Sequence, residues 1–158
     1  MPLPVGSAAP DFTLKCAKDG QVVDVTLSSH HGSENVVLLF YPGAFTPVCQ
    51  KEMCSITDGL GDYHELNAAV YGISGDTQFA LAEWAKQFGI AVPLLADYQR
   101  SVTRAYNVTW PNFAGLGEGV ARAVFVIDKE GIIRYAEQTP TLLDLPHFDA
   151  VQECLRGL

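Results

Sequence analysis

Residues 36–54 read Val36-Val37-Leu38-Leu39-Phe40-Tyr41-Pro42-Gly43-Ala44-Phe45-Thr46-Pro47-Val48-Cys49-Gln50-Lys51-Glu52-Met53-Cys54. The run Val36–Tyr41 is apolar without alternation, as is typical of a strand buried on both faces of a sheet. Pro42-Gly43 then indicates a turn. Thr46-Pro47 indicates a helix start, because threonine is a favoured N-cap and proline suits the first helical position. We therefore expect a buried strand that delivers Cys49 to a helix N-terminus.

The composition limits what the chain can be. With 158 residues it fits a single domain spanning 1–158, and 48% hydrophobic with 18% charged residues is typical of a globular protein. The net charge of -8 argues against a nucleic-acid or anionic-membrane partner. No apolar run approaches the roughly 20 residues that span a bilayer. No signal peptide is recognisable at the N-terminus, so we expect a cytoplasmic location.

Strands and helices alternate through the rest of the chain. The predicted strands are Phe12–Cys16, Val22–Thr26, Val36–Tyr41, Ala68–Ser74, Val92–Ala96, Ala123–Ile127 and Ile132–Glu137, with the first two joined at Lys18-Asp19-Gly20. The predicted helices are Thr46 to about Leu66 (weakened by Gly59 and Gly61), Gln78–Phe88, Tyr98–Tyr106 and Pro146–Leu155. Ser28–Asn35 and Asn107–Val120 are expected to be loops. This order predicts an α/β thioredoxin fold, with a central mixed sheet flanked by helices and an N-terminal β-hairpin extension.

The expected position of Cys49 favours a reactive thiolate. If Thr46 is the N-cap, Cys49 falls in the first helical turn, where free N–H groups carry a partial positive charge. Cysteines in such places become nucleophiles. The Thr46 hydroxyl would reach the sulfur or an incoming oxygen, besides capping the helix. We expect Pro42 and Phe45 to wall this pocket from water.

Glu52 lies three residues beyond Cys49 on the same helix face. An isolated carboxylate there would disfavour the thiolate, so it needs a neutralising cation. The sequence offers Arg122, immediately before the buried strand Ala123–Ile127, which the fold would bring near the helix start. An arginine beside the sulfur would stabilise the thiolate. Taken alone, each of these residues would be an ordinary surface charge or first-turn carboxylate.

The segment Pro42-Gly43-Ala44-Phe45-Thr46-Pro47-Val48-Cys49 resembles the PxxxTxxC signature of the peroxiredoxins. The resemblance extends over Gly6–Leu14, Val70–Ser74, Pro93–Asp97 and Arg122–Asp128. It implies reduction of hydrogen peroxide and organic hydroperoxides, with Cys49 as the peroxidatic cysteine that forms a sulfenic acid. Thr46 and Arg122 would position the peroxide and Pro42 would shield the sulfur. Glu52 would support Arg122, and Phe45 and Val48 would belong to the pocket.

Cys54 is the candidate resolving cysteine. It lies five positions after Cys49, about 7.5 Å along a helix axis and roughly 140° around it. A disulfide needs Cα atoms within about 7 Å, so the helix start would have to unwind first. The CxxxxC spacing resembles the Q-type (bacterioferritin-comigratory) peroxiredoxins. The residues before Cys49 instead resemble the type 5 and alkyl hydroperoxide reductase-E groups. Alternatively Cys54 is a small core residue, and Cys16, Cys154 or an external thiol resolves Cys49.

Two other functions compete with this interpretation. A thioredoxin-like disulfide oxidoreductase would have CxxC at the helix start, whereas this chain has CxxxxC. A redox-inert interaction module would not need Thr46, Cys49 and Arg122 together. The histidines His30, His31, His64 and His147 are scattered, and we predict no metal and no cofactor. The resemblance implies thioredoxin or a similar thiol as reductant, and a homodimer.

Overall fold

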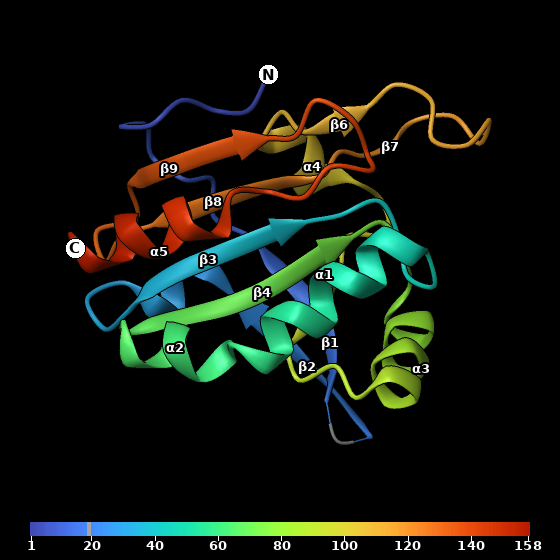
Figure 1. The fold of residues 1–158 in the computed structure, drawn as a ribbon, viewed down its shortest axis with the longest axis horizontal. Coiled ribbons are helices and arrows are strands. Elements are labelled where there is room, and N and C mark those ends of the chain that lie inside the picture. The colour runs from blue at the N-terminus through green and yellow to red at the C-terminus, as the bar shows by residue number, and fades with distance from the viewer. Residues whose placement is uncertain (19) are drawn as a thin grey trace.

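The computed structural model describes residues 1–18 and 20–158. Within them a seven-stranded sheet forms the centre of the molecule, in the order β2-β1-β5-β4-β3-β8-β9 (Figure 1). Its strands are β1 (Thr13–Lys18), β2 (Gln21–Thr26), β3 (Asn35–Phe40), β4 (Ala68–Ser74), β5 (Leu94–Ala96), β8 (Ala123–Ile127) and β9 (Ile133–Gln138). Two short strands, β6 (Thr109–Trp110) and β7 (Gly119–Val120), pair with each other outside this sheet.

The sheet is mixed, as the sequence predicts. Strand β3 is an inner strand, parallel to β4 on one side and antiparallel to β8 on the other. In the antiparallel ladder Phe40, the last residue of β3, pairs with Ala123, the first residue of β8. The loop after β3 and the residue before β8 therefore emerge side by side at one edge of the sheet. This is the edge at which the sequence places Cys49 and Arg122.

Helices cover both faces of the sheet. On one face lie α1 (Pro47–Asp58), α2 (Leu60–Glu65), α3 (Gln78–Phe88) and α5 (Phe148–Arg156); on the other lie α4 (Ser101–Ala105) and the short 3-10 helix η1 (Leu27–His30) (Figure 1). Alternate residues of β3 serve the two cores. Val37 and Leu39 face α1, and Val36 and Leu38 face the opposite core. The chain thus has the predicted thioredoxin fold with an N-terminal β-hairpin.

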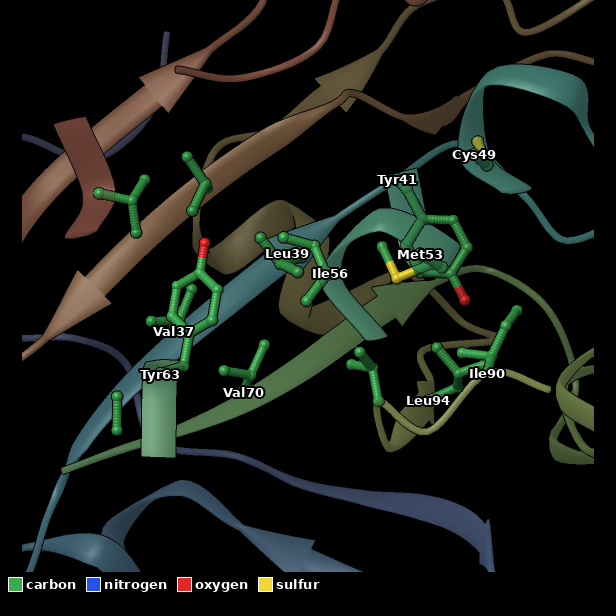
Figure 2. Packing of buried hydrophobic residues seen from close by; sticks show 14 of the residues in the cluster. Val37, Leu39, Tyr41, Cys49, Met53, Ile56, Tyr63, Val70, Ile90 and Leu94 are labelled. Carbon is green, nitrogen blue, oxygen red and sulfur yellow. The ribbon is translucent and has the colours of Figure 1, made fainter. Parts of the chain in front are cut away.

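Helix α1 packs tightly against the sheet, which fixes the direction in which it starts. Met53 and Ile56 enter the core between α1 and strands β3 and β4 (Figure 2). Gly72 on β4 makes room for this packing, because a Cβ there would lie 3.1 Å from the Tyr41 ring and 3.3 Å from the Met53 sulfur. The same Cβ would lie 2.9 Å from Cδ2 of Leu94, so a larger residue at Gly72 would force these core side chains to shift.

Several sequence expectations need correction. The predicted helix from Thr46 to about Leu66 is two helices, because the chain breaks at Gly59, where a weak point was expected. The predicted loop Ser28–Asn35 is wrong at its start, where η1 forms, and at its end, where Asn35 begins β3. The predicted irregular stretch Asn107–Val120 contains the β6–β7 ladder.

The other predicted elements are confirmed with shifted bounds. The strand Val92–Ala96 is reduced to β5 and the helix Tyr98–Tyr106 to α4. Of the predicted hairpin turn Lys18-Asp19-Gly20, Asp19 lies outside the described residues. In the part of the chain that the structure describes, none of the helices has the length and apolar character needed to cross a bilayer.

Candidate active site

Helix α1 begins where the sequence predicts, but the hydroxyl of its N-cap residue makes a different hydrogen bond from the one expected. Thr46 is the N-cap with extended backbone angles, and Pro47 opens the first turn. The Thr46 hydroxyl does not cap α1; it donates to the carbonyl oxygen of Gly43 at 2.7 Å. Thr77, by contrast, caps α3 by accepting from the N–H of Ala80 at 3.2 Å. The expected cap bond of Thr46 is therefore wrong, and its hydroxyl closes the loop before α1 instead.

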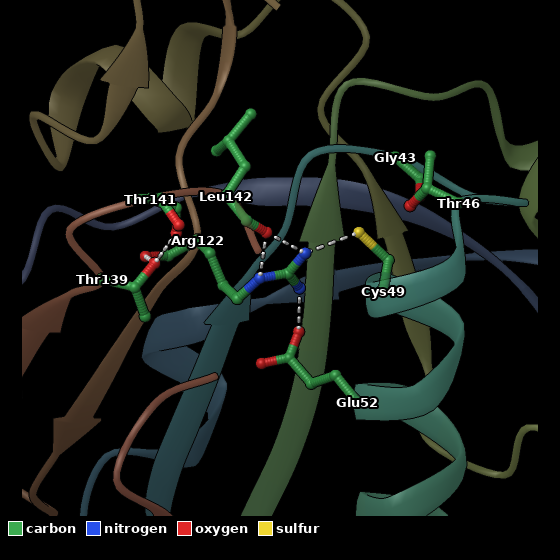
Figure 3. A network of polar contacts seen from close by, with 8 residues as sticks. All are labelled: Gly43, Thr46, Cys49, Glu52, Arg122, Thr139, Thr141 and Leu142. Atoms are coloured by element: carbon green, nitrogen blue, oxygen red, sulfur yellow. Dashed lines mark hydrogen bonds and ion pairs between the residues drawn. The ribbon is translucent and has the colours of Figure 1, made fainter. Parts of the chain in front are cut away.

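Arg122 joins Cys49 to Glu52 (Figure 3). Its Nη2 atom lies 3.1 Å from the Cys49 sulfur, and its Nη1 atom donates to Glu52 Oε1 at 2.8 Å. All three side chains are buried, with relative exposures of 1% for Arg122 and Cys49 and 0% for Glu52. The structure thus brings together the cation, the carboxylate and the thiol that the sequence proposed as a unit. In a dry site such contacts are stronger than in water.

A backbone carbonyl that the sequence did not single out holds the guanidinium in place. Leu142 accepts from Arg122 Nε at 3.1 Å and from Nη2 at 2.9 Å. The loop that carries Leu142 is fixed by Thr139, whose N–H donates to the Arg122 carbonyl at 2.9 Å and whose hydroxyl donates to the Thr141 carbonyl at 2.7 Å. A carbonyl group is common to every residue type, so no sequence signal could have identified it.

The contacts of the Glu52 carboxylate compensate only in part for its burial. Burial raises its pKa from 4.5 to about 7, although the charge and hydrogen bond of Arg122 act in the opposite direction. Its Oε2 atom is buried and has no hydrogen-bond partner among the described residues. A buried ion pair with one unsatisfied oxygen costs desolvation energy that the pairing does not fully offset. Buried charged groups with perturbed pKa values cluster at functional sites, so this feature of Glu52 indicates a functional position.

A small apolar cavity opens onto the sulfur. Its volume is about 220 Å³, and its lining combines the loop before α1, the first turn of α1 and two further loops. The lining residues are Pro42, Thr46, Pro47, Val48, Cys49, Phe113, Ala114, Arg122, Leu142 and Leu143. Pro42 and Val48 thus lie where the sequence expects them.

Phe45 does not line the cavity, which corrects the expected wall position. Its ring packs against Trp84 and Phe88 of α3, at centroid distances of 6.4 and 6.3 Å, and is half exposed. Phe113 and Leu143 close the cavity in its place. Neither residue belongs to the segment 42–49 from which the pocket was predicted.

The second cysteine of the motif faces away from the first. Cys54 lies in the same intact helix as Cys49, and its sulfur is 3.9 Å from the carbonyl oxygen of Phe88, at the end of α3. Cys16 is buried in the opposite core, and Cys154 lies on α5 with its sulfur 3.7 Å from the Arg134 carbonyl. The structure therefore brings neither Cys16 nor Cys154 to Cys49.

Comparison with known proteins agrees with this geometry. The sequence model of the AhpC/TSA family matches residues 5–136. Peroxiredoxin-2 of Bos taurus is 38% identical over 96% of this chain and 75% of its own length. The chloroplastic 2-Cys peroxiredoxin BAS1 of Hordeum vulgare is 33% identical over 98% of this chain and 73% of its own.

Solved structures show the same relationship. The reduced 2-Cys peroxiredoxin of Plasmodium vivax superposes with a TM-score of 0.87 at 28% identity, covering 98% of this chain and 81% of that one. Peroxidoxin BcpB of Mycobacterium tuberculosis superposes with a TM-score of 0.84 at 31% identity, covering 98% and 97%. The fold, the buried Cys49–Arg122–Glu52 unit and these relatives lead to one conclusion: the chain belongs to the AhpC/TSA family and is a peroxiredoxin, a thiol peroxidase.

Proposed function

We propose that Cys49 is the peroxidatic cysteine, and that it reduces both hydrogen peroxide and organic hydroperoxides. The observation that carries this proposal is the 3.1 Å contact between Arg122 Nη2 and the Cys49 sulfur, at the bottom of an apolar cavity. A buried cation beside a thiol favours the thiolate, which is the nucleophilic form. The cavity admits a small substrate while keeping most water from the sulfur.

The reaction is a displacement at oxygen. The Cys49 thiolate attacks one peroxide oxygen, so that an S–O bond forms as the O–O bond breaks. The sulfur is oxidised by two electrons to a sulfenic acid, and the peroxide is reduced to water or alcohol after the leaving oxygen takes up a proton. Arg122 stabilises the negative charge that moves from sulfur to oxygen, because its guanidinium is already fixed by Leu142 and Glu52.

Thr46 would act on the peroxide as a hydrogen-bond acceptor. A hydroxyl has one hydrogen and two lone pairs, and the Thr46 hydrogen is already donated to Gly43. Its free lone pair is therefore available to the O–H group of an incoming hydroperoxide, since Thr46 lines the cavity together with Cys49. Thr46 and Arg122 then orient opposite ends of the O–O bond.

Cys54 is our candidate for resolving the sulfenic acid. Both cysteines lie in α1, and a helix holds residues five positions apart too far from each other, and too far around its axis, to form a disulfide. The first turns of α1 must therefore unwind before an intramolecular disulfide forms. We propose thioredoxin or a similar dithiol as the reductant that restores the two thiols.

Peroxide turnover with thioredoxin and thioredoxin reductase tests these assignments. We expect Cys49→Ser to be inactive, and activity in that variant would overturn the central proposal. Cys54→Ser should form the sulfenic acid but lose thioredoxin-linked turnover, with Cys154→Ser as the matched control. Full turnover by Cys54→Ser would instead mean a one-cysteine peroxidase that an external thiol resolves, or a resolving role for Cys16 or Cys154.

Three further proposals concern the whole protein. We propose that residues 1–158 form one domain, that the protein is cytoplasmic, and that it forms a homodimer. The seven-stranded sheet supports the first, because it combines strands from the N-terminal and C-terminal parts of the described residues. Fractionation of cells and analytical ultracentrifugation of the pure protein test the other two, which rest on the sequence.

A further inference from the structure

We propose that Asp76 is a positioning residue for the peroxidase reaction, and that it acts by tethering the loop 42–46 through the backbone of Ala44. Asp76 follows β4, and in the chain the rest of α1, α2 and β4 lie between it and Cys49. One carboxylate oxygen, Oδ2, accepts from the Ala44 N–H at 2.8 Å and from the Ser74 hydroxyl at 2.8 Å. This inference rests on the proposed roles of Cys49 and Thr46.

The tether meets the loop at the point that controls Thr46. Ala44 follows Gly43, whose carbonyl accepts the Thr46 hydroxyl at 2.7 Å. The Gly43 carbonyl and the Ala44 N–H belong to one planar peptide group, so Asp76 holds the same peptide that orients the hydroxyl facing the peroxide. Moving Ala44 would rotate the Gly43 carbonyl and release the Thr46 hydrogen from its present direction. The effect of Asp76 on the substrate is thus transmitted through two hydrogen bonds.

Open space lies along two sides of this loop. The cavity over Cys49 lies along one side of it, and a second cavity of about 200 Å³, lined in part by Asp76 and Phe113, lies along another. Both cavities share Pro42 and Thr46 as lining residues, so the loop forms a partition between them. A charged hydrogen bond to the backbone of a segment with open space on two sides is expected to have a large effect on its position.

The loop is also strained. Phe45 has a φ of 61°, in the left-handed region that bulky residues with a Cβ rarely adopt. Such a conformation persists only when the surroundings impose it. The tether at Ala44 precedes the strained residue, and Pro47 and helix α1 follow it. Without the tether, the strain favours relaxation of the loop away from its present shape.

Ser74 completes the arrangement. It is fully buried at the end of β4, and its hydroxyl fixes the carboxylate that receives the Ala44 N–H. The hydroxyl also accepts the Asp76 N–H at 3.4 Å. Because β4 is parallel to β3 and hydrogen-bonded to it, the tether has a rigid base. The catalytic loop is thereby tied to the strand neighbouring the one from which it emerges.

The test compares two reactions of the same sulfur in single-turnover experiments. One is oxidation of Cys49 by hydrogen peroxide, which uses Thr46, and the other is alkylation of Cys49 by iodoacetamide, followed by peptide mapping, which does not. We expect Asp76→Ala to slow oxidation about 10- to 100-fold while alkylation changes about twofold at most, because small misplacements of an orienting group have such effects. Asp76→Asn, which keeps an acceptor oxygen, should recover most of the oxidation rate.

Ser74→Ala should give an intermediate loss, and Glu65→Ala, at an exposed carboxylate on α2, should leave both rates unchanged. The proposal is overturned if Asp76→Ala and Ser74→Ala oxidise at the wild-type rate, or if oxidation and alkylation fall by the same factor. Thermal unfolding of each variant separates a global loss of structure from the selective effect. Activity in Cys49→Ser would refute the proposed function itself, whatever the Asp76 variants show.

Discussion

Cys49 and Glu52 share one guanidinium: the sulfur of Cys49 lies 3.1 Å from Nη2 of Arg122, and Oε1 of Glu52 lies 2.8 Å from Nη1. Two groups that can each carry a negative charge therefore compete for a single buried cation. A carboxylate that is fully ionised would weaken the hold of Arg122 on the thiolate. Burial of Glu52 reduces this competition, because it raises the pKa of the carboxyl group to about 7.

Replacing Arg122 by lysine should reduce the rate of Cys49 oxidation by peroxide about 10²- to 10³-fold, as expected for loss of a preorganised donor to the transition state. Lysine keeps the charge but lacks the planar fork that bonds Leu142, Glu52 and the sulfur together. Stopped-flow fluorescence measures the rate. The matched control is Arg156→Lys, at an exposed ion pair on α5. A loss of threefold or less would contradict the role of the fork.

Glu52 makes the stability of the protein depend on pH. Its pKa is raised from 4.5 in the unfolded chain to about 7 in the folded one, so the folded state binds more protons between these values. The contribution of Glu52 is therefore fully present below pH 4.5 and is lost as the pH rises through 7. We expect the stability of the wild type relative to Glu52→Gln to fall between pH 5 and 8, by a few kcal/mol at about 1.4 kcal/mol per pKa unit.

Urea unfolding at a series of pH values measures this difference. Glu52→Gln removes the titrating group but keeps an oxygen for Arg122 Nη1. A difference between the two proteins that stays constant from pH 5 to 8 would show that Glu52 is ionised throughout. The same experiment on Glu65→Gln, at an exposed carboxylate, provides the baseline.

Oxidation should unwind α1 and leave α2 intact. Cys49 and Cys54 both lie in α1, and the chain leaves the helix at Gly59 before α2 begins. After one equivalent of peroxide, we expect faster amide hydrogen exchange in peptides from 47–58 and unchanged exchange in peptides from 60–65. Cys54→Ser should keep the protection of the reduced protein in both. Equal protection of α1 before and after oxidation of the wild type would argue against an intramolecular disulfide.

Leu143 should favour organic hydroperoxides. It lines the cavity over Cys49, yet 76% of it is exposed, so an apolar substituent on the peroxide would cover it. We expect Leu143→Ala to slow the reaction with cumene hydroperoxide about 3- to 10-fold, from the apolar surface that is no longer buried, and to leave the reaction with hydrogen peroxide unchanged. Leu116→Ala, at an exposed residue of the second cavity, is the control. Equal effects on both peroxides would contradict a role in selectivity.

The sequence predicts those features that depend on residue type in a local pattern. The unalternating run 36–41 predicts a strand buried on both faces, and the Thr-Pro pair predicts where α1 begins. The need to neutralise Glu52 predicts Arg122 as its partner, although 70 residues separate them. In each case the chemical nature of the side chains determines the environment they need: burial, a helix start or a neighbouring cation.

Other features depend on the direction of a group in space. The Thr46 hydroxyl could bond either an N–H of α1 or the Gly43 carbonyl, and in the structure it bonds the carbonyl. The positive φ of Phe45 turns its aromatic ring toward α3. The Leu142 carbonyl and the Asp76–Ala44 bond involve backbone atoms, which every residue has. No pattern of residue types distinguishes these alternatives, so they emerge only from the folded chain.

The pairing of Phe40 with Ala123 sets the register between β3 and β8, and this register fixes the position of Arg122 relative to Cys49. Side chains alternate between the faces of a strand, so a slip of one residue would carry the guanidinium of Arg122 to the face opposite Cys49. Lengthening the loop between β8 and β9, at the end of β8 opposite Arg122, should therefore have little effect on the Cys49 sulfur. An insertion of one residue into β3 or β8 would disconnect it from its cation while leaving the fold recognisable.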